Sequence, residues 1–423
     1  MSTGQQAPLS LVLSAAVRLV RLVGRLSRVS GRGRGGTLPG KVLLRLRPTA
    51  LAELTAGRQV VLVSGTNGKS TTTRLLAAAL SSGGTVVSNI QGANLLAGLV
   101  TAVLGSAERG APAVLEVDEI VVPAALAATR AEILVLLNLS RDQLDRVQEV
   151  ASHVARWSAA LRAAPWVHVV ANADDPLVVT AVLQGEVSRD RCTWVGAGSP
   201  WQRDASLCPR CGRAWDPAAE SWHCSGCGLS RPETTWALVA DDQMTSPGGE
   251  LTVLNLALPG RASASDAVMA AAAAHLVHIP VAAATARMRS VQDIDGRYLT
   301  VQLDGRSVRL LLAKNPAGWL EVLDQVAHGS EVLLLGVNAR IADGTDPSWL
   351  WDVPFEQLAG RQVVVFGERA LDLSTRLFYA EVVHQVSSDV GAALELAAGQ
   401  PVVVAANYTA FVQTRAVLRG AAG

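Results

Sequence analysis

The sequence predicts an α/β fold built on parallel strands with helices between them. A β-branched apolar run at 60–63 leads into a glycine-rich turn and then a helical run rich in Thr, Leu and Ala. Strand-like segments keep alternating with helical ones to about residue 138, and a second such series begins near residue 299. This alternation indicates parallel sheets covered on both faces, and 423 residues are enough for two cores.

The composition indicates a well-buried globular protein. Hydrophobic residues make up 49% and charged residues 17%, which excludes a disordered chain, and a net charge of +1 offers no argument for wholesale nucleic-acid binding. Four of the five cysteines form Cys-x-x-Cys pairs, which indicates metal binding in a reducing compartment rather than disulfides. No apolar run is long enough to cross a bilayer, so we expect a soluble, cytoplasmic protein.

An N-terminal helical segment is expected over 1–44. Residues 9–29 carry apolar side chains at helical spacing and four arginines three or four residues apart, and a glycine-rich break follows at 31–36. Such a helix either lies on an anionic membrane surface or packs on the protein with its arginines in solvent. We favour the second interpretation, because charged faces are common on surface helices.

The turn after the first strand has the chemistry of a phosphate-binding loop. Its glycines permit a tight turn, and the N–H groups at the start of the following helix favour an anion. Lys69 would contact the outer phosphates of a nucleotide, and the Ser70 hydroxyl would contact Mg²⁺. Val63 stands where the longer Walker motif has its first glycine. The predicted ATP-binding residues of the loop are Gly65, Thr66, Asn67, Gly68, Lys69, Ser70 and Thr71.

The alternative is an ordinary Gly- and Ser-rich turn between a strand and a helix. The choice of basic residues speaks against it, because the chain has 34 arginines and only three lysines, Lys41, Lys69 and Lys314. A lysine kept at position 69 indicates a function that needs a compact ammonium group rather than a planar guanidinium.

Polar residues stand at the ends of the strands that follow. Ligands of parallel sheets bind at the carboxyl ends of the strands. Glu116 lies inside an apolar strand, where an unpaired carboxylate is costly, so we expect it to bind Mg²⁺. Asp118 and Glu119 come next, and we interpret Glu119 as an exposed loop charge. These strands are predicted at Thr85–Ser88, Ala113–Val117 and Glu132–Asn138.

Four motifs in order resemble the central ATPase domain of the Mur ligases, which build the peptide of bacterial cell-wall precursors. They are the loop GTNGKS at 65–70, the strand residue Glu116, NLSRDQLD at 138–145 and NADDP at 172–176. The resemblance implies ATP and Mg²⁺ as cofactors, an acyl-phosphate intermediate and catalytic roles for Lys69 and Glu116. It also implies that Asn172 and Asp174 contact the nucleotide base and ribose.

The chain departs from the amino-acid-adding Mur ligases at two points. Those enzymes usually carry a metal-binding His where Gln143 stands, and a carbamylated Lys about a dozen residues before the segment that matches 172–176. No lysine occurs between Lys69 and Lys314. The resemblance therefore does not extend to the usual second-metal ligands. Asp142 and Asp145 either cap a helix or contact metal and substrate, and we favour the contacts.

A zinc ribbon is predicted as an insertion at 205–230. Two Cys-x-x-Cys pairs twelve residues apart, the second followed by glycine, are typical of a tetrahedral Zn²⁺ site. We expect a structural site rather than a nucleic-acid-binding one, because the insertion has few basic residues. Cys192 is interpreted as a small buried hydrophobic residue. The predicted ligands are Cys208, Cys211, Cys224 and Cys227.

The remaining chain completes two domains. A single Ala-rich helical stretch is predicted over Ser263–Met288, and residues 295–297 form a boundary turn. The central ATPase domain is expected over 45–296, and a Rossmann-like α/β domain over 297–423. Strands of the second domain are predicted at about 299–303, 307–312, 332–336, 362–366 and 401–405.

Segments 312–319 and 338–356 of the second domain resemble the MurT family, the ligase subunits of lipid II isoglutaminyl synthases. The resemblance implies ATP-dependent amidation of the D-glutamate α-carboxyl in the lipid II stem peptide to D-isoglutamine, with glutamine as amido donor. It implies a heterodimer with a GatD-type class I glutamine amidotransferase docked on the second domain. It also implies work on lipid II at the cytoplasmic face of the membrane, without crossing it.

An acidic residue of the second domain is expected to orient ammonium and take its proton. We choose Asp352, between Trp351 and Val353, with Asp346 and Glu356 as weaker candidates; the alternative for Asp352 is a helix N-cap. Lys314 would contact an anionic substrate or form a salt bridge. Two other functions stay open: an amino-acid-adding ligase, and a nucleotide- and zinc-dependent nucleic-acid-binding protein.

Overall fold

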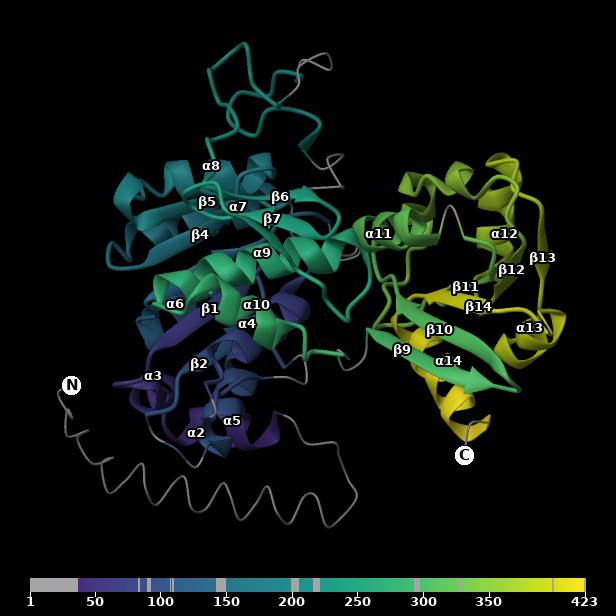
Figure 1. Cartoon of the computed structure of the whole chain (residues 1–423), viewed down its shortest axis with the longest axis horizontal. Helices are drawn as coiled ribbons and strands as arrows, with labels where there is room; N and C mark the ends of the chain where they lie inside the picture. Colours follow the sequence, from purple (N-terminus) through teal and green to yellow (C-terminus); the bar gives the residue numbers. More distant parts are fainter. Residues whose placement is uncertain are drawn as a thin grey trace. The chain divides into compact units, whose positions relative to one another are not determined.

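The computed structural model describes residues 37–421, except 83, 90–92, 107, 109, 142–149, 199–204, 216–220, 293–296, 327–328 and 398. The expected helix at 9–29 lies outside this range. The chain forms two compact units (Figure 1). Unit 1 comprises Met1–Leu139, Val150–Ser199 and Ala205–Gln292, and unit 2 comprises Ser140–Glu149, Pro200–Asp204 and Asp293–Gly423.

Unit 1 is built on an eight-stranded sheet in the order β2-β1-β3-β4-β5-β6-β7-β8. Pairing is parallel from β2 through to β6 and antiparallel for β7 and β8. Every residue of the first three strands is buried, as expected for a parallel sheet with helices on both faces. The strands are β1 Val60–Ser64, β2 Ala113–Glu116, β3 Ile133–Leu136, β4 His168–Asn172, β5 Cys192–Gly196, β6 Trp236–Ala240, β7 Gln243–Thr245 and β8 Leu251–Val253.

The prediction of a strand at Thr85–Ser88 is wrong. Only Val87 pairs there, as an isolated parallel bridge to Ala113. The next hydrogen bonds of this edge are made by a side chain: Asn89 Oδ1 accepts from Glu116 N at 2.8 Å, and Asn89 Nδ2 donates to Glu116 O at 2.8 Å. A side-chain amide thus replaces the backbone ladder, and the strand does not continue.

The helices of unit 1 include one break that the prediction missed. The stretch Ser263–Met288 is two helices, because His278 adopts a left-handed φ of 63° and Pro280 precedes the second helix. The first of them, α9, packs with α4 and α10 (Figure 1). The helices are α2 Leu38–Leu46, α3 Ala50–Thr55, α4 Lys69–Leu80, α5 Leu96–Gly105, α6 Val122–Thr129, α7 Val150–Arg162, α8 Pro176–Gln184, η1 Arg189–Arg191, α9 Gly260–Leu276 and α10 Val281–Met288.

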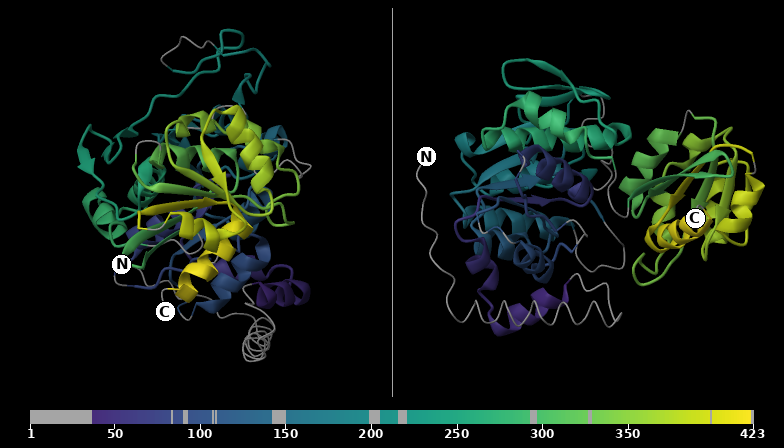
Figure 2. Two further views of the ribbon diagram at one scale, coloured as in Figure 1. Left: turned by 90° about the vertical axis from the view of Figure 1, so that its right-hand side faces the viewer. Right: turned by 60° about the horizontal axis from the view of Figure 1, so that its bottom comes forward.

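Unit 2 has a six-stranded sheet in the order β13-β12-β11-β14-β10-β9, parallel except for β9. The five predicted strands are confirmed, and β13 was missed. Alternate strand residues enter two cores, one with α11 and α12 and the other with α13 and α14, so helices lie on both faces (Figure 2). The elements are β9 Tyr298–Leu303, β10 Arg306–Leu312, α11 Pro316–Val326, β11 Val332–Gly336, η3 Ser348–Asp352, η4 Phe355–Leu358, β12 Val363–Phe366, α12 Ala370–Tyr379, β13 His384–Val386, α13 Val390–Leu396, β14 Val402–Ala406 and α14 Tyr408–Ala421.

Candidate active site

The predicted phosphate loop lies between β1 and α4. Gly68, the residue before α4, has a left-handed φ of 81°. Gly65 has a φ of 148°, and a Cβ there would lie 2.8 Å from Leu137 Cβ, so only glycine fits. The loop is braced on the end of β3, because Thr66 N donates to Asn138 O at 3.0 Å and Asn67 N donates to Asn138 Oδ1 at 2.9 Å. The N–H groups at the start of α4 belong to the positive end of its dipole.

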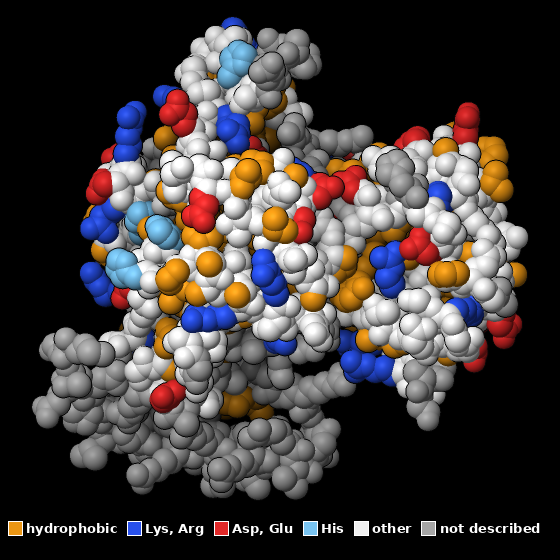
Figure 3. Space-filling view, viewed as in Figure 1, with side chains coloured by type: hydrophobic (Ala, Val, Ile, Leu, Met, Phe, Trp, Pro, Cys, Tyr) orange, Lys and Arg blue, Asp and Glu red, His pale blue; other side chains and the backbone are white. Residues whose placement is uncertain are grey.

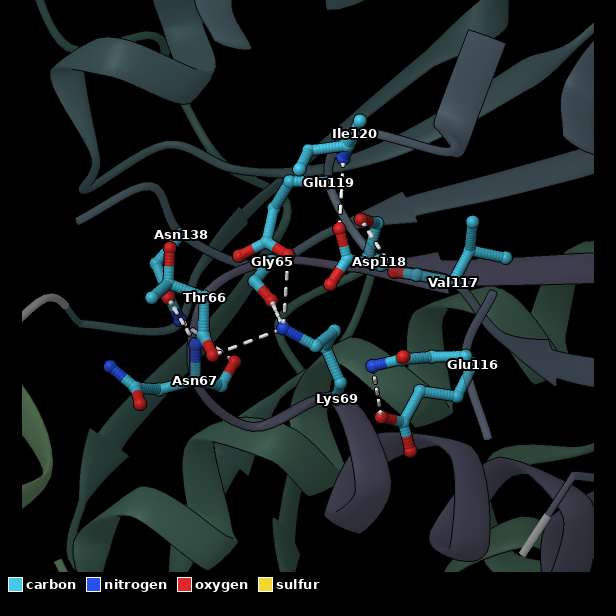
Figure 4. Close-up of polar contacts among 12 residues, drawn as sticks. Gly65, Thr66, Asn67, Lys69, Glu116, Val117, Asp118, Glu119, Ile120 and Asn138 are labelled. Atoms are coloured by element: carbon cyan, nitrogen blue, oxygen red, sulfur yellow. Dashed lines mark hydrogen bonds and ion pairs between the residues drawn. The ribbon is translucent and has the colours of Figure 1, made fainter. Parts of the chain in front are cut away.

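Lys69 is folded back over its own loop. Its Nζ donates to the carbonyl oxygens of Gly65 and Thr66 and lies 3.2 Å from Glu119 Oε2 (Figure 4). Lys69 is 4% exposed and Glu119 is 8% exposed. The interpretation of Glu119 as an exposed loop charge is therefore wrong. Its backbone oxygen is also fixed, by a 3.0 Å hydrogen bond from Trp157 Nε1 of α7.

Glu119 is the residue of this site that the sequence analysis missed. A buried lysine needs a countercharge, and a carboxylate three residues after Glu116 was the available signal. The surroundings are partly dry: burial lowers the pKa of His153 on α7, and the Glu119 carboxylate acts in the opposite direction.

Glu116 and Ser70 form the second half of the loop site. Ser70 Oγ donates to Glu116 Oε2 at 2.7 Å, and Asn94 Nδ2 donates to Glu116 Oε1 at 3.2 Å. Mg²⁺ prefers oxygen ligands, and here a hydroxyl oxygen and a carboxylate oxygen lie next to each other, so these residues fit that ion. Asp142, Gln143 and Asp145 lie outside the described residues.

Asn172 and Asp174 stand at the carboxyl end of β4 and shape the turn there. Asn172 Nδ2 donates to Gly198 O at 2.9 Å, and Asp174 Oδ2 accepts from Gly198 N at 2.7 Å. Asp174 Oδ1 also accepts from Arg231 Nε at 2.5 Å. These contacts build the turns after β4 and β5, and the two residues are not hydrogen-bonded to the loop at 65–71 among the contacts of the described residues.

The four ribbon cysteines come together in unit 1. Their sulfur atoms lie within 4.8 Å of one another, with 3.6 Å between Cys208 and Cys227 and 3.4 Å between Cys211 and Cys224. Zn–S bonds of about 2.3 Å in a tetrahedron place sulfurs about 3.8 Å apart, so the cluster fits Zn²⁺. Four thiolates would complete the tetrahedral coordination of such an ion, as in structural zinc sites.

The three candidate carboxylates of unit 2 have different partners. Asp346 Oδ1 accepts from Ser348 N at 2.8 Å, which is a local turn contact. Glu356 Oε1 lies 2.8 Å from Arg376 Nη2 and is committed to that pair. Asp352 is the last residue of η3 and is not a helix N-cap. Its side chain is 33% exposed, and its Oδ2 lies 3.3 Å from Nη2 of Arg141, which also belongs to unit 2. Lys314, the remaining candidate, follows β10 at the carboxyl end of that strand and is partly buried.

Unit 2 also carries exposed apolar side chains on and after α12. Leu371, Phe378, Tyr379 and Val383, here called the α12 patch, are 68% to 85% exposed. Tyr379 contacts Phe378 and the half-exposed Trp351, with ring centroids 5.8 and 5.5 Å apart. Hydrophobic side chains are visible at the surface over this part of the unit (orange in Figure 3). Large exposed apolar groups that cluster are typical of protein–protein contacts.

Comparisons with known proteins agree with this architecture. The Mur ligase middle domain family matches residues 63–199, and the MurT ligase C-terminal family matches residues 312–411. The MurT subunit of lipid II isoglutaminyl synthase (glutamine-hydrolyzing) from Streptococcus pneumoniae is 28% identical, over 94% of this chain and 96% of its own. The subunit of the same name from Staphylococcus aureus is 28% identical, over 87% and 88%.

Solved structures share the fold. A pseudomurein peptide ligase type C from Methanothermus fervidus has a TM-score of 0.66 at 18% identity, covering 86% of this chain and 79% of that one. At this identity the likeness concerns the fold alone. Within the described parts of the chain, no helix has the length and apolar character needed to span a bilayer.

Proposed function

Because the chain matches the Mur ligase middle domain over residues 63–199 and the MurT ligase C-terminal domain over residues 312–411, we propose that it amidates lipid II. The reaction converts the D-glutamate α-carboxyl of the stem peptide to D-isoglutamine at the expense of ATP. The observation that carries this proposal is the arrangement of Lys69, Ser70 and Glu116 beyond the carboxyl end of β1, in a chain whose second unit matches the MurT ligase C-terminal family.

The first step activates a poor electrophile. An oxygen of the substrate carboxylate attacks the γ-phosphorus of ATP, ADP leaves, and an acyl phosphate forms. Lys69 would turn from Glu119 to the outer phosphates and offset their charge, and the N–H groups at the start of α4 would hold the same oxygens. Ser70 and Glu116 would hold Mg²⁺, which supplies charge neutralisation during the transfer. Asn172 and Asp174 would meet the nucleoside end of ATP.

The second step forms the amide. Ammonium gives a proton to the Asp352 carboxylate, and the nitrogen lone pair attacks the acyl carbon. The C–O bond to phosphate then breaks, and the departing phosphate takes the second proton from the nitrogen, which leaves the neutral amide. The partly exposed Asp352 side chain, paired with Arg141, suits this work, because it keeps a charged carboxylate at a surface that a small cation reaches. Lys314 is proposed to contact an anionic part of the substrate.

Ammonia would come from glutamine hydrolysis on another subunit. Its relatives are named as subunits of a glutamine-hydrolyzing synthase. This chain offers no thiolate for that hydrolysis: four cysteines form the metal cluster, and burial raises the pKa of Cys192 to about 12. We therefore infer a heterodimer with a GatD-type class I glutamine amidotransferase, with the α12 patch as its docking surface.

Two further assignments complete the proposal. Zn²⁺ would occupy the four-cysteine cluster as a structural ion, without contact to substrate. The enzyme would be cytoplasmic and would act on lipid II at the inner face of the membrane, since the acceptor is a lipid-linked molecule.

The test is amide formation by the purified chain. Lipid II, ATP, Mg²⁺ and ammonium chloride should give the amidated product, detected by mass spectrometry, and Lys69→Ala should give none. Addition of the glutaminase subunit should let glutamine replace ammonium. If an amino acid is added instead of ammonia, the chain is an amino-acid-adding ligase; if no product forms with ammonium or glutamine, the amidation proposal fails.

A further inference from the structure

Arg376 is a buried cation on the inner side of α12. It is 5% exposed, whereas Phe378 and Tyr379 at the end of the same helix belong to the exposed α12 patch. A buried guanidinium lowers stability through its desolvation unless a countercharge and hydrogen-bond acceptors offset that cost. The contacts of Arg376 therefore indicate what the helix holds in place.

The hydrogen bonds and ring contacts of its guanidinium fall on the short segment that contains Asp352. Arg376 Nη2 donates to Val353 O at 2.7 Å and to the Glu356 carboxylate oxygens at 2.8 and 3.0 Å. The guanidinium carbon also lies 5.6 Å from the centre of the Trp351 ring and 5.7 Å from that of Phe355. One side chain thus touches the residues on both sides of Asp352.

The segment needs such support. Asp352 ends the 3-10 helix η3, and the hydrogen bond that closes that end, Val353 N to Leu350 O, is long at 3.4 Å. Short 3-10 turns have poor hydrogen-bond geometry and are held by their surroundings. A planar guanidinium can pair with a carboxylate, donate to a carbonyl and lie against two rings at once, which an ammonium group cannot do.

We infer that Arg376 is a positioning residue for the amidation step, which fixes the direction of the Asp352 carboxylate; this inference rests on the proposed function. Arg376 acts through Asp352 and touches neither nucleotide nor ammonium. Glu356 serves the same purpose from the other side, as the countercharge of Arg376, rather than as an ammonium-binding group.

The same contacts link the α12 patch to Asp352. A partner seated on the patch acts directly on α12, and within unit 2 the guanidinium of Arg376 joins that helix to Val353 and Glu356. If the glutaminase subunit docks on the patch, we expect it to change how tightly the segment of Asp352 is held. This predicts that the partner stimulates the ammonium-dependent reaction itself, beyond supplying ammonia, and that Arg376→Lys loses this stimulation.

The experiment compares conservative variants in the full chain, with and without the glutaminase subunit. Arg376→Lys keeps the charge but loses the planar guanidinium, whose Nη2 makes the hydrogen bonds to Val353 and Glu356, and its contacts with the two rings. Arg361→Lys is the matched control, because only 9% of the Arg361 side chain is exposed and it also pairs with a glutamate, Glu331, in the same unit. Amide formation is followed against ammonium concentration and, separately, against ATP concentration, with thermal unfolding as a check on folding.

We expect kcat/KM for ammonium to fall about tenfold or more in Arg376→Lys, with KM for ATP changed less than about twofold. Arg361→Lys should leave both unchanged even if it lowers stability. In an Asp352→Asn background, Arg376→Lys should add less than about a twofold loss, because residues that act through one group are not additive.

Three results would overturn the inference. Equal losses in Arg376→Lys and Arg361→Lys would mean a general effect of folding. Independent, multiplying losses in the double variant would mean that Arg376 does not act through Asp352. A wild-type ammonium response retained in Arg376→Lys would mean that the segment is held without it. A wild-type chain that makes no amide from ammonium or glutamine would instead refute the proposed function, and this inference with it.

Discussion

The two units place their charged groups in opposite ways. In unit 1, Lys69 is buried and all its contacts come from the adjoining loop and from Glu119, at the ends of neighbouring strands. In unit 2, Asp352 is partly exposed, and its segment is held by Arg376 from a helix that begins 18 residues later. A nucleotide site needs a rigid, dry cradle, whereas capture of a small cation needs an accessible carboxylate with a fixed direction.

Replacement of the buried lysine should have the largest effect. Lys69→Ala removes the only lysine of the loop, and we expect loss of ATP-dependent product formation by about 10³-fold or more. Lys41→Ala, on the exposed side of α2, is the control and should be silent. A Lys69→Ala chain with near-normal turnover would remove the reason for placing the chemistry in unit 1.

Removal of zinc should affect one unit only. The cysteine cluster belongs to unit 1, so a chelator or Cys208→Ser should release about one Zn²⁺ per chain and expose the amides around the ribbon. Hydrogen exchange in the strands of unit 2 should stay the same. Equal loss of protection in both units would contradict a structural role confined to the ribbon.

Two helix caps allow the units to be compared for stability. Asp175 caps α8 from a buried position and accepts from Leu177 N, Val178 N and Leu139 N, so Asp175→Ala should cost about 3 kcal/mol. Asp389 caps α13 in solvent, and Asp389→Ala should lower the unfolding temperature much less. Denaturation of both variants beside the wild type measures the difference, and similar losses would contradict it.

The exposed cap should also depend on pH. The hydrogen bond from Ala392 N lowers the pKa of Asp389 below its ordinary value of 3.8. The stabilisation is therefore present above that value and is lost as the pH falls through the lower, folded-state pKa. The difference in stability between Asp389→Ala and the wild type should disappear at acidic pH. A difference in stability that grows as the pH falls would contradict the assignment of Asp389 as the cap.

The last prediction concerns the partner of the lysine. In Glu119→Gln, Lys69 no longer faces a buried carboxylate that competes with phosphate oxygens, so ATP should bind about tenfold more tightly. Asp118→Asn is the control, since Asp118 accepts from Ile120 N in the same turn. Weaker ATP binding in Glu119→Gln, measured by calorimetry, would mean that Glu119 positions the lysine instead.

The sequence predicts well what is encoded locally. A strand, two glycines and a helix start define the loop, Cys-x-x-Cys spacing defines the cysteine cluster, and near-continuous apolar runs define most of the strands. The break before Pro280 was also visible in the sequence, although the Ala-rich pattern on both sides hid it.

Contacts between distant segments could not be predicted in this way. The burial of Glu119 depends on its ion pair with Lys69 and on the hydrogen bond that its backbone oxygen accepts from Trp157 of α7. The replacement of a strand by the Asn89 side chain depends on Glu116, 27 residues away. The pairing of Glu356 with Arg376, which removes Glu356 from the candidates for ammonium binding, likewise needs the folded packing of α12 on η4.

One measurement tests most directly whether unit 1 activates the carboxylate and unit 2 handles the proton of ammonia. Hydroxylamine is largely unprotonated at neutral pH, so it can trap an acyl phosphate without a base, whereas ammonium needs one. We predict that Asp352→Asn keeps ATP-dependent hydroxamate formation while its amide formation from ammonium falls by about 10²-fold or more. Lys69→Ala should lose both. Equal loss of hydroxamate and amide in Asp352→Asn would contradict the division of work between the two units.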